Sequence, residues 1–247
     1  MLFGQESFKD RVDLTDEEFF RKLGQASQLP TTSAPAPGEF AEVFERLSRE
    51  CSGCISIHIG AQLSGTAEAA RVGAESVPGF EVHVVDSRSV SMTIAFLCRV
   101  AAEAESLETA VKAVEERVPR QRVIALLDTL RYVEMGGRVS RAQAMIGSML
   151  DLKPILGLAG DDGRINALDR VRTRSRAIPR MLDLMRADLP VESLAVMHAQ
   201  APEEADRIRA EVQKELPDLE VETGQIGCVL GTHAGPRALG LIYVKKA

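Results

Sequence analysis

The sequence predicts an α/β protein with two domains. Through the first half, apolar strand-like runs alternate with helical segments, an order that is typical of a parallel sheet with right-handed crossovers. From about residue 119 the pattern changes, and two strand-like runs are separated only by Gly160-Asp161-Asp162-Gly163, a hairpin signal. Because a hairpin pairs its strands antiparallel, we predict a Rossmann-like domain over residues 1–120 and an α/β domain with a mixed sheet over residues 121–247.

Composition narrows the function classes. The chain has 247 residues, 45% of them hydrophobic, which is enough for a large core. A net charge of −6, no Trp and only two Tyr argue against nucleic acid as a partner. No apolar run has the length of a membrane span, no signal-peptide pattern opens the chain, and four cysteines without a disulfide framework suggest reduced thiols. We therefore expect a cytoplasmic location.

The first half opens with an apolar strand fragment at Met1–Phe3. Thr15-Asp16-Glu17-Glu18 is a capping box that should begin a helix ending near Gly24. A stiff, proline-rich loop at 29–38 leads to a helix whose apolar face runs from Phe40 to Leu47. Further strands are expected at 54–59 and 81–87, with helices at 66–74, 89–104 and 106–118.

The second half should contain six strands and three helices. The strands are expected at 123–127, 154–158, 164–169, 194–197, 219–223 and 238–244, and the helices at roughly 129–149, 175–188 and 202–216.

A turn at Gln62–Ala67 joins the strand at 54–59 to the next helix. We expect Ser64 to be the N-cap of that helix, with Gly65 beside it. Free backbone N–H groups and the helix dipole favour an anion at such a turn, and ligands of open α/β sheets bind beyond the carboxyl ends of strands. The alternative is plain capping with no ligand.

Two glycine-rich motifs in the second half are also candidates. Thr232-His233-Ala234-Gly235-Pro236 precedes the last strand, where His233 is either a donor to a carboxylate or a solvated turn residue. Arg138 follows Gly136-Gly137, and it either holds an anion or neutralises a helix C-terminus.

A local excess of arginine stands out on this acidic chain. The run consists of Arg164, Arg170, Arg172, Arg174, Arg176 and Arg180, and a single acid, Asp169, lies within it. It predicts docking of an acidic protein surface, a phosphorylated ligand or an anionic membrane. The alternative is a solvated helix start.

Other chemistry has weaker support. Cys51-Ser52-Gly53-Cys54 has redox spacing, but it follows a helix instead of opening one, so we expect ordinary thiols. The histidines have no metal-ligand spacing, and no nucleotide-binding loop is present, so we expect neither metal nor cofactor. A serine hydrolase with Ser64 as nucleophile, His233 as base and Asp86 as orienting acid remains the alternative enzyme.

Taken together, the motifs resemble the DegV family of bacterial fatty-acid-binding proteins over the whole chain. The motifs that carry the resemblance are Thr31-Thr32-Ser33, Leu63-Ser64-Gly65-Thr66, Val85-Asp86-Ser87, Gly136-Gly137-Arg138-Val139-Ser140, Lys153-Pro154-Ile155, Val171-Arg172-Thr173 and Gly231-Thr232-His233-Ala234-Gly235-Pro236. The resemblance implies a Rossmann-like domain, a mixed-sheet domain and a buried acyl chain. It also implies a role in phospholipid metabolism, in which the acid is presented to a separate fatty acid kinase.

The resemblance assigns roles to individual residues. Thr32 and Ser64 match the hydroxyls that hold the carboxylate, His233 matches a residue near the head group, and Arg138 is a supporting residue. The segment Ala144–Leu150 is apolar enough to line the acyl chain. The basic run at 170–180 lies where contact with a kinase, or a transient contact with a membrane surface, would be convenient.

The sequence departs from the family pattern in two places. Members begin with a strand carrying an Asp-Ser motif, whereas this chain starts at what resembles the end of the second strand, so the parallel sheet is expected to lack its first strand. Gly60-Ala61 replaces two serines that many members carry.

Overall fold

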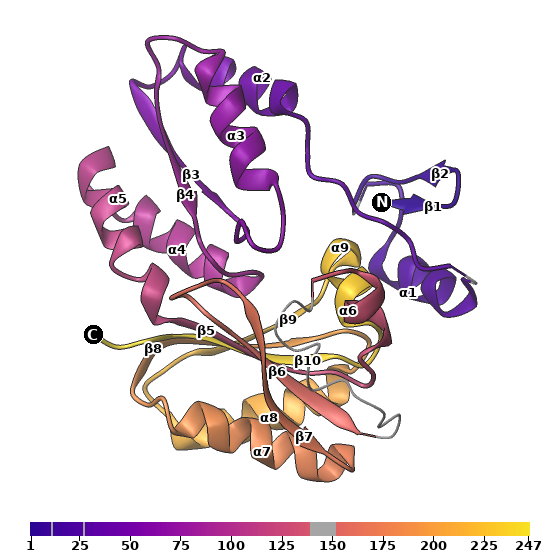
Figure 1. Ribbon diagram of the computed structural model, residues 1–247. Coiled ribbons are helices and arrows are strands. Elements are labelled where there is room, and N and C mark those ends of the chain that lie inside the picture. The colour runs from indigo at the N-terminus through magenta and orange to yellow at the C-terminus, as the bar shows by residue number, and fades with distance from the viewer. Residues whose placement is uncertain (11, 27, 139–151) are drawn as a thin grey trace. The chain divides into compact units, whose positions relative to one another are not determined.

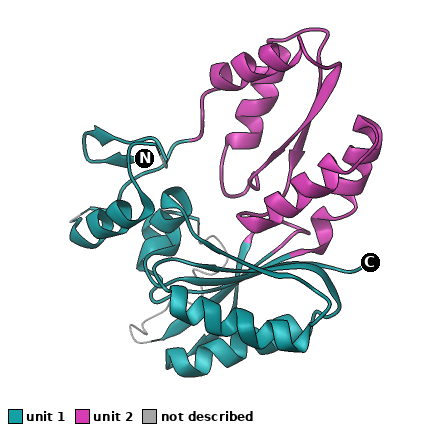
Figure 2. Cartoon of the chain, turned by 180° about the vertical axis from the view of Figure 1, so that it is seen from behind, with its two compact units in different colours: residues 1–33, 122–158, 165–247 teal, residues 34–121, 159–164 magenta. Residues whose placement is uncertain are grey.

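The computed structural model describes residues 1–247 except 11, 27 and 139–151. The chain forms two compact units (Figure 2). Unit 1 comprises residues 1–33, 122–158 and 165–247, and unit 2 comprises residues 34–121 and 159–164. The division at 121–122 lies next to the predicted boundary, but residues 1–33 group with the C-terminal half, whereas the sequence pattern had assigned them to the first domain.

A mixed sheet of six strands forms the centre of unit 1 (Figure 1). The strands are β5 (Gln121–Leu126), β6 (Lys153–Ala159), β7 (Ile165–Val171), β8 (Val191–His198), β9 (Val221–Gln225) and β10 (Leu239–Lys245). Their order is β7-β6-β5-β10-β8-β9. β6 and β7 pair antiparallel, as do β10 and β8, whereas β8 and β9 run parallel. The predicted hairpin and the predicted mixed sheet are therefore confirmed.

The core of unit 1 lies between this sheet and two helices, α7 (Arg174–Arg186) and α8 (Pro202–Glu215). Both helices cover the same face of the sheet (Figure 1). Met181 and Met185 of α7, and Ile208 and Val212 of α8, recur at a spacing of four residues and are buried, so each helix has one apolar stripe. Leu241 in the central strand β10 is fully buried in the same cluster.

The N-terminal segment of unit 1 is a small substructure. β1 (Leu2–Phe3) and β2 (Glu6–Ser7) form their own antiparallel two-stranded sheet, followed by α1 (Asp16–Gln25). The predicted strand at Met1–Phe3 exists, but it pairs with the next few residues. The predicted capping box is confirmed, because Thr15 and Glu18 each accept the other's backbone N–H, at 3.2 and 3.0 Å.

Two short helices are also described in unit 1: α6 (Arg131–Met135) and α9 (Cys228–Ala234). α9 replaces a region that the sequence pattern indicated to be a turn. The predicted long helix at 129–149 is described only at its start, as α6, because its later part falls on residues outside the described range.

Unit 2 is built on a parallel pair, β3 (Gly53–His58) and β4 (Glu81–Asp86), in which Gly53 lies opposite Glu81. One face is covered by α2 (Pro37–Leu47) and α3 (Thr66–Glu75) through Phe44 and Ala70. The other face is covered by α4 (Met92–Ala102) and α5 (Leu107–Glu115), and a 3-10 turn follows at Val118–Arg120. The predicted parallel α/β layering is confirmed for this unit. Within the described part of the chain, no helix has the length and apolar character that crossing a membrane requires.

Candidate functional site

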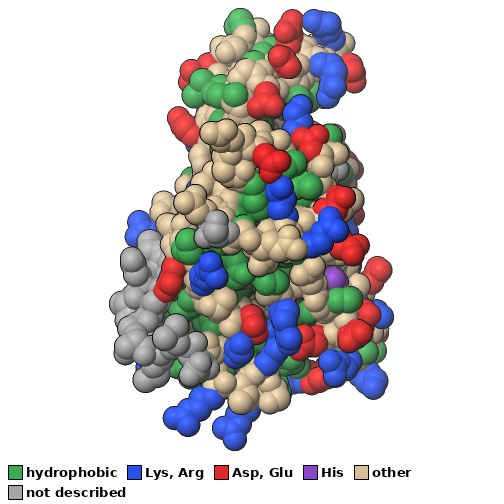
Figure 3. All heavy atoms as spheres, turned by 90° about the vertical axis from the view of Figure 1, so that its right-hand side faces the viewer, with side chains coloured by type: hydrophobic (Ala, Val, Ile, Leu, Met, Phe, Trp, Pro, Cys, Tyr) green, Lys and Arg blue, Asp and Glu red, His purple; other side chains and the backbone are tan. Residues whose placement is uncertain are grey.

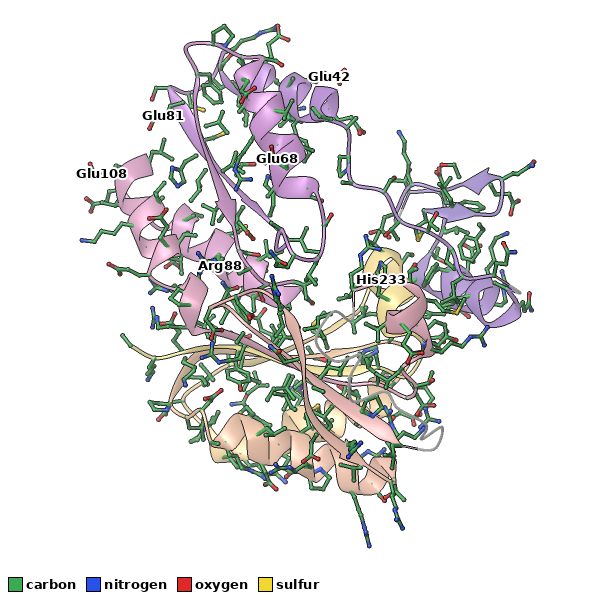
Figure 4. All side chains as sticks on the ribbon, viewed as in Figure 1. Glu42, Glu68, Glu81, Arg88, Glu108 and His233 are labelled. Carbon is green, nitrogen blue, oxygen red and sulfur yellow. The ribbon has the colours of Figure 1, made fainter. Side chains whose placement is uncertain are left out.

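Glycines allow helix α9 to pack closely against its two neighbours, α1 and α6. A side chain at Gly231 would meet the ring of Phe20 at 2.7 Å and that of Phe19 at 3.0 Å, so α1 packs directly on the α9 backbone. Gly235 ends the helix with φ at +75°, and the ring of Tyr132 from α6 covers it. Figure 4 shows His233 on α9, beside α6. The motif that the sequence analysis marked as a turn is therefore a short helix that holds His233 in a packed position.

Thr32 is brought to this helix by the N-terminal hairpin. Leu2 and Thr31 exchange two backbone hydrogen bonds, of 2.8 and 3.0 Å, which fixes the chain just before Thr32. Thr32 Oγ1 then lies 3.3 Å from His233 Nε2. Two predicted site residues that are 201 positions apart in the sequence are therefore in hydrogen-bond contact.

The electrostatics of His233 make it a neutral group. Burial, and to a smaller extent the positive charge of Arg138, lower the pKa of His233 to about 4. At pH 7 the imidazole therefore has one N–H donor and one acceptor nitrogen. Arg138 Nη1 donates to the carbonyl oxygen of Gly136 at 2.6 Å, and Gly136 in turn contacts the His233 ring. Thr32, His233 and Arg138 thus gather in unit 1.

This arrangement suits an acceptor ligand. A hydroxyl, an imidazole and a guanidinium together offer several hydrogen-bond donors, and one of them is charged. A carboxylate is the natural complement, because it is an acceptor at both oxygens. A histidine with such a low pKa is a weak general base near neutral pH, because proton transfer is best served by a pKa close to the working pH.

Ser64 and Gly65 lie in unit 2, in the turn between β3 and α3. The prediction that Ser64 caps the helix was wrong: α3 begins at Thr66 with Gly65 as its N-cap, and no side chain caps it. The Ser64 hydroxyl instead lies 2.8 Å from the hydroxyl of Thr66. A role for Ser64 and Gly65 in binding an anion stays a prediction.

Asp86 holds this turn in place. Its Oδ1 accepts the backbone N–H of Ala61 at 3.0 Å and that of Arg88 at 2.8 Å, so it ties the turn after β3 to the loop after β4. A side chain at Gly60 would meet the Arg88 backbone at 3.0 Å, which explains the glycine there. Figure 4 marks Arg88 in this loop. Sequence reasoning considered Asp86 only as a catalytic acid and missed this role in holding the two loops together. The position of Asp86 at the end of a strand could have indicated that role.

The basic run divides into exposed and paired residues. Arg172 and Arg176 are exposed. Arg174, by contrast, is 11% exposed and makes two hydrogen bonds to Glu204, of 2.7 and 2.9 Å. Figure 3 shows Lys and Arg side chains toward the lower edge of the face drawn, with Asp and Glu among them. Arg174 therefore has a structural role in unit 1 that the docking interpretation did not anticipate.

The remaining candidate groups show no reactive arrangement. All four cysteines are free, and burial raises the pKa of Cys54, the second member of the Cys-x-x-Cys motif. Burial lowers the pKa of His58 and of His198. Among the described residues, no group of three or more His, Cys, Asp or Glu is placed to hold a metal ion. The segment Ala144–Leu150, predicted to line the acyl chain, lies outside the described residues.

The fold and the site define a class: a two-unit α/β protein with a cluster of neutral and cationic hydrogen-bond donors around a half-buried histidine. The family model described as uncharacterised proteins of the DegV family matches residues 1–246. The chain belongs to the DegV family.

Individual proteins agree with this assignment. The chain is 36% identical to a DegV domain-containing protein of Caldanaerobacter subterraneus over 98% of this chain and 88% of the relative. Its structure is similar to that of DegV, a fatty acid binding protein from Bacillus subtilis, with a TM-score of 0.88, 33% identity, and coverage of 99% and 89% of the two chains. The structure of a fatty-acid-binding DegV family protein from Thermus thermophilus gives a TM-score of 0.86 at 30% identity, with coverage of 97% and 87%.

Proposed function

We propose that this protein binds a long-chain fatty acid and is not itself an enzyme. The observation that carries the proposal is the contact between Thr32 Oγ1 and His233 Nε2 at 3.3 Å, with Arg138 nearby. These groups are suited to a carboxylate, which must not be buried without partners. The fatty acid binding stated for the Bacillus and Thermus proteins supports the same class of ligand. Ser64 and Gly65 are predicted contributors from unit 2.

The acyl tail supplies most of the binding free energy in this proposal. Each buried methylene contributes about 0.8 kcal/mol, so a sixteen-carbon tail gains roughly 11 kcal/mol before costs. Association and ordering cost on the order of 4 kcal/mol or more, which leaves enough for tight binding. The head-group residues then fix the orientation of the acid.

The alternative function is a serine hydrolase that uses Ser64 and His233. Two observations count against it. The pKa of His233, near 4, makes the imidazole a weak base at neutral pH. Asp86, the proposed orienting acid, uses its Oδ1 to accept two backbone N–H groups of unit 2. A serine-directed probe tests this alternative, because stoichiometric labelling of Ser64 would favour the hydrolase.

We also propose a partner, a fatty acid kinase that receives the bound acid in the cytoplasm and makes acyl phosphate. The exposed Arg172 and Arg176 are the docking candidates, for an acidic kinase surface or for transient contact with an anionic membrane. Arg174 is better suited to hold Arg172 and Arg176 in place than to meet a partner, because Glu204 already neutralises it.

The deciding experiment is native mass spectrometry of the purified protein, followed by organic extraction. We expect a retained mass equal to that of a common long-chain fatty acid. A protein that retains no acid and shows no binding of added palmitate or oleate would contradict the proposal.

A displacement assay on Ser64→Ala then tests the contribution of unit 2. Loss of one hydrogen bond to a charged group should weaken binding by roughly 1–2 kcal/mol. Unchanged affinity would remove Ser64 from the site.

A further inference from the structure

Gly136 is in unusually close contact with His233. A side-chain carbon on Gly136 would overlap His233 Nδ1 and would lie 3.0 Å from Cε1. The imidazole therefore packs edge-on against the Gly136 backbone, with Nδ1 turned inward and Nε2 turned toward Thr32. Any larger residue at 136 has to displace the ring.

His233 Nδ1 is buried and has no hydrogen-bond partner among the described residues. A neutral imidazole has two tautomers, and they differ in what they bury here. With the proton on Nδ1, the tautomer buries an N–H donor with nothing to receive it. With the proton on Nε2, the ring buries only a lone pair, and the positive charge of Arg138 disfavours a second proton on the ring.

The choice of tautomer determines the direction of the Thr32 hydrogen bond. If the proton is on Nε2, the imidazole donates to Thr32 Oγ1 across the 3.3 Å contact. Thr32 Oγ1 then accepts from the ring, so its own proton is free to point elsewhere. If the proton were on Nδ1, Thr32 would have to donate to Nε2, and its hydroxyl would have no proton left for a ligand.

We propose that Gly136 and His233 are positioning residues that act through Thr32: Gly136 locks the ring with its proton on Nε2, and His233 then directs the Thr32 hydroxyl proton toward the bound ligand. The second half of this proposal rests on the proposed function. It makes Thr32 a dedicated donor, and the group that it recognises is therefore an acceptor such as an ionised carboxylate.

The tautomer is measured directly on the protein without added fatty acid. Nitrogen-15 NMR of the imidazoles, with the His233 signals assigned by comparison with His233→Gln, distinguishes a protonated from a bare ring nitrogen. We expect Nε2 protonated and Nδ1 bare at pH 7. A proton on Nδ1 would overturn the proposal, whether or not the protein binds fatty acids.

Binding measurements test the relay. Gln places its amide nitrogen near the position of Nε2, whereas the amide nitrogen of Asn is closer to the position of Nδ1. We therefore expect His233→Gln to keep most of the palmitate affinity, and His233→Asn and Thr32→Val each to lower it about tenfold or more. Equal losses in the Gln and Asn variants would contradict the relay.

Gly136→Ala tests the lock, with Gly24→Ala as the matched control in the same unit. An added carbon at Gly24 meets nothing within 4 Å. We expect Gly136→Ala to lower palmitate affinity about tenfold and to shift the His233 nitrogen signals, while Gly24→Ala changes neither. Wild-type signals and affinity in a folded Gly136→Ala variant would overturn the role of Gly136.

If the Gly136→Ala variant does not fold, the His233→Gln and His233→Asn pair and the NMR measurement still decide the proposal. Failure of the wild type to bind any fatty acid would contradict the proposed function and leave the tautomer result standing.

Discussion

The main sheets of the two units differ in how completely they are buried. In unit 1, six consecutive residues of β10, Leu239–Val244, are buried, and the strand has a neighbour on each side. In unit 2, every residue of β3 is partly exposed, and the sheet consists of two strands within the described part of the chain. Small sheets depend on the helices that cover them, because two strands alone are marginally stable. We infer that unit 1 holds most of the stability of the chain and that unit 2 is the easier one to open.

The largest expected effect comes from a matched pair of core truncations. Leu241→Ala in β10 should lower the free energy of unfolding of unit 1 by about 3–4 kcal/mol, because the side chain is fully buried. Ile57→Ala in β3 should cost roughly 1–2 kcal/mol, because that side chain is only partly buried. Denaturant unfolding, followed separately in each unit by hydrogen exchange, measures both. Equal costs would contradict the difference between the sheets.

Ion pairs in the two units should also differ in how much they contribute to stability. Arg174→Ala leaves Glu204 without its bidentate partner in a site that is largely buried, and should destabilise unit 1 by about 2–3 kcal/mol. Arg49→Ala in unit 2 removes an exposed pair with Glu45 and should change stability by less than about 0.5 kcal/mol. Thermal unfolding checks both variants. If Arg174→Ala left the stability of unit 1 unchanged, Arg174 would again be a candidate for docking.

Acid should weaken unit 1 through His233. Its pKa in the folded protein, about 4, lies below the ordinary value of 6.5, so the unfolded chain takes up the proton first as pH falls. The stability that this residue contributes is therefore complete above pH 6.5, and about 3 kcal/mol of it is lost as pH falls toward 4. The difference between wild type and His233→Gln across this range isolates the effect from the other titrating groups. A constant difference would show that the ring titrates normally.

The smallest expected effect concerns the turn that carries Ser64 in unit 2. Asp86→Ala removes the acceptor of two backbone N–H groups and should cost about 1 kcal/mol, with faster hydrogen exchange at Ala61 and Arg88. Asp86→Asn keeps an acceptor oxygen at the same position and should restore slow exchange. Loss of protection in both variants would mean that the charge, and not the acceptor geometry, holds the turn.

Local patterns predicted the local features of the fold well. The capping box at Thr15–Glu18, the parallel pairing of β3 with β4 and the hairpin at Gly160–Gly163 each depend on residues close in sequence or on strand–helix alternation. The glycine-rich motif indicated His233, whereas only the resemblance to a family supplied Thr32, and no spacing rule connects the two residues.

The missed features depend on distant contacts. α9 contains glycine at 231 and is followed by another at 235, and such a segment has low helix propensity. It is helical because Phe19, Phe20 and Tyr132 pack against those glycines, which a local reading of the sequence does not reveal. The grouping of residues 1–33 with unit 1 depends in the same way on the contact of α1 with α9 and of Thr32 with His233.

The way the chain threads through its two units has a practical consequence. It passes from one unit to the other at residues 33–34, 121–122, 158–159 and 164–165, so neither unit is a continuous stretch of sequence. A truncation after residue 121 would leave unit 2 without the hairpin tip, and a fragment from 122 onward would lack Thr32 and α1. Dissection of this protein therefore calls for paired fragments or circular permutants that keep the strand ends joined.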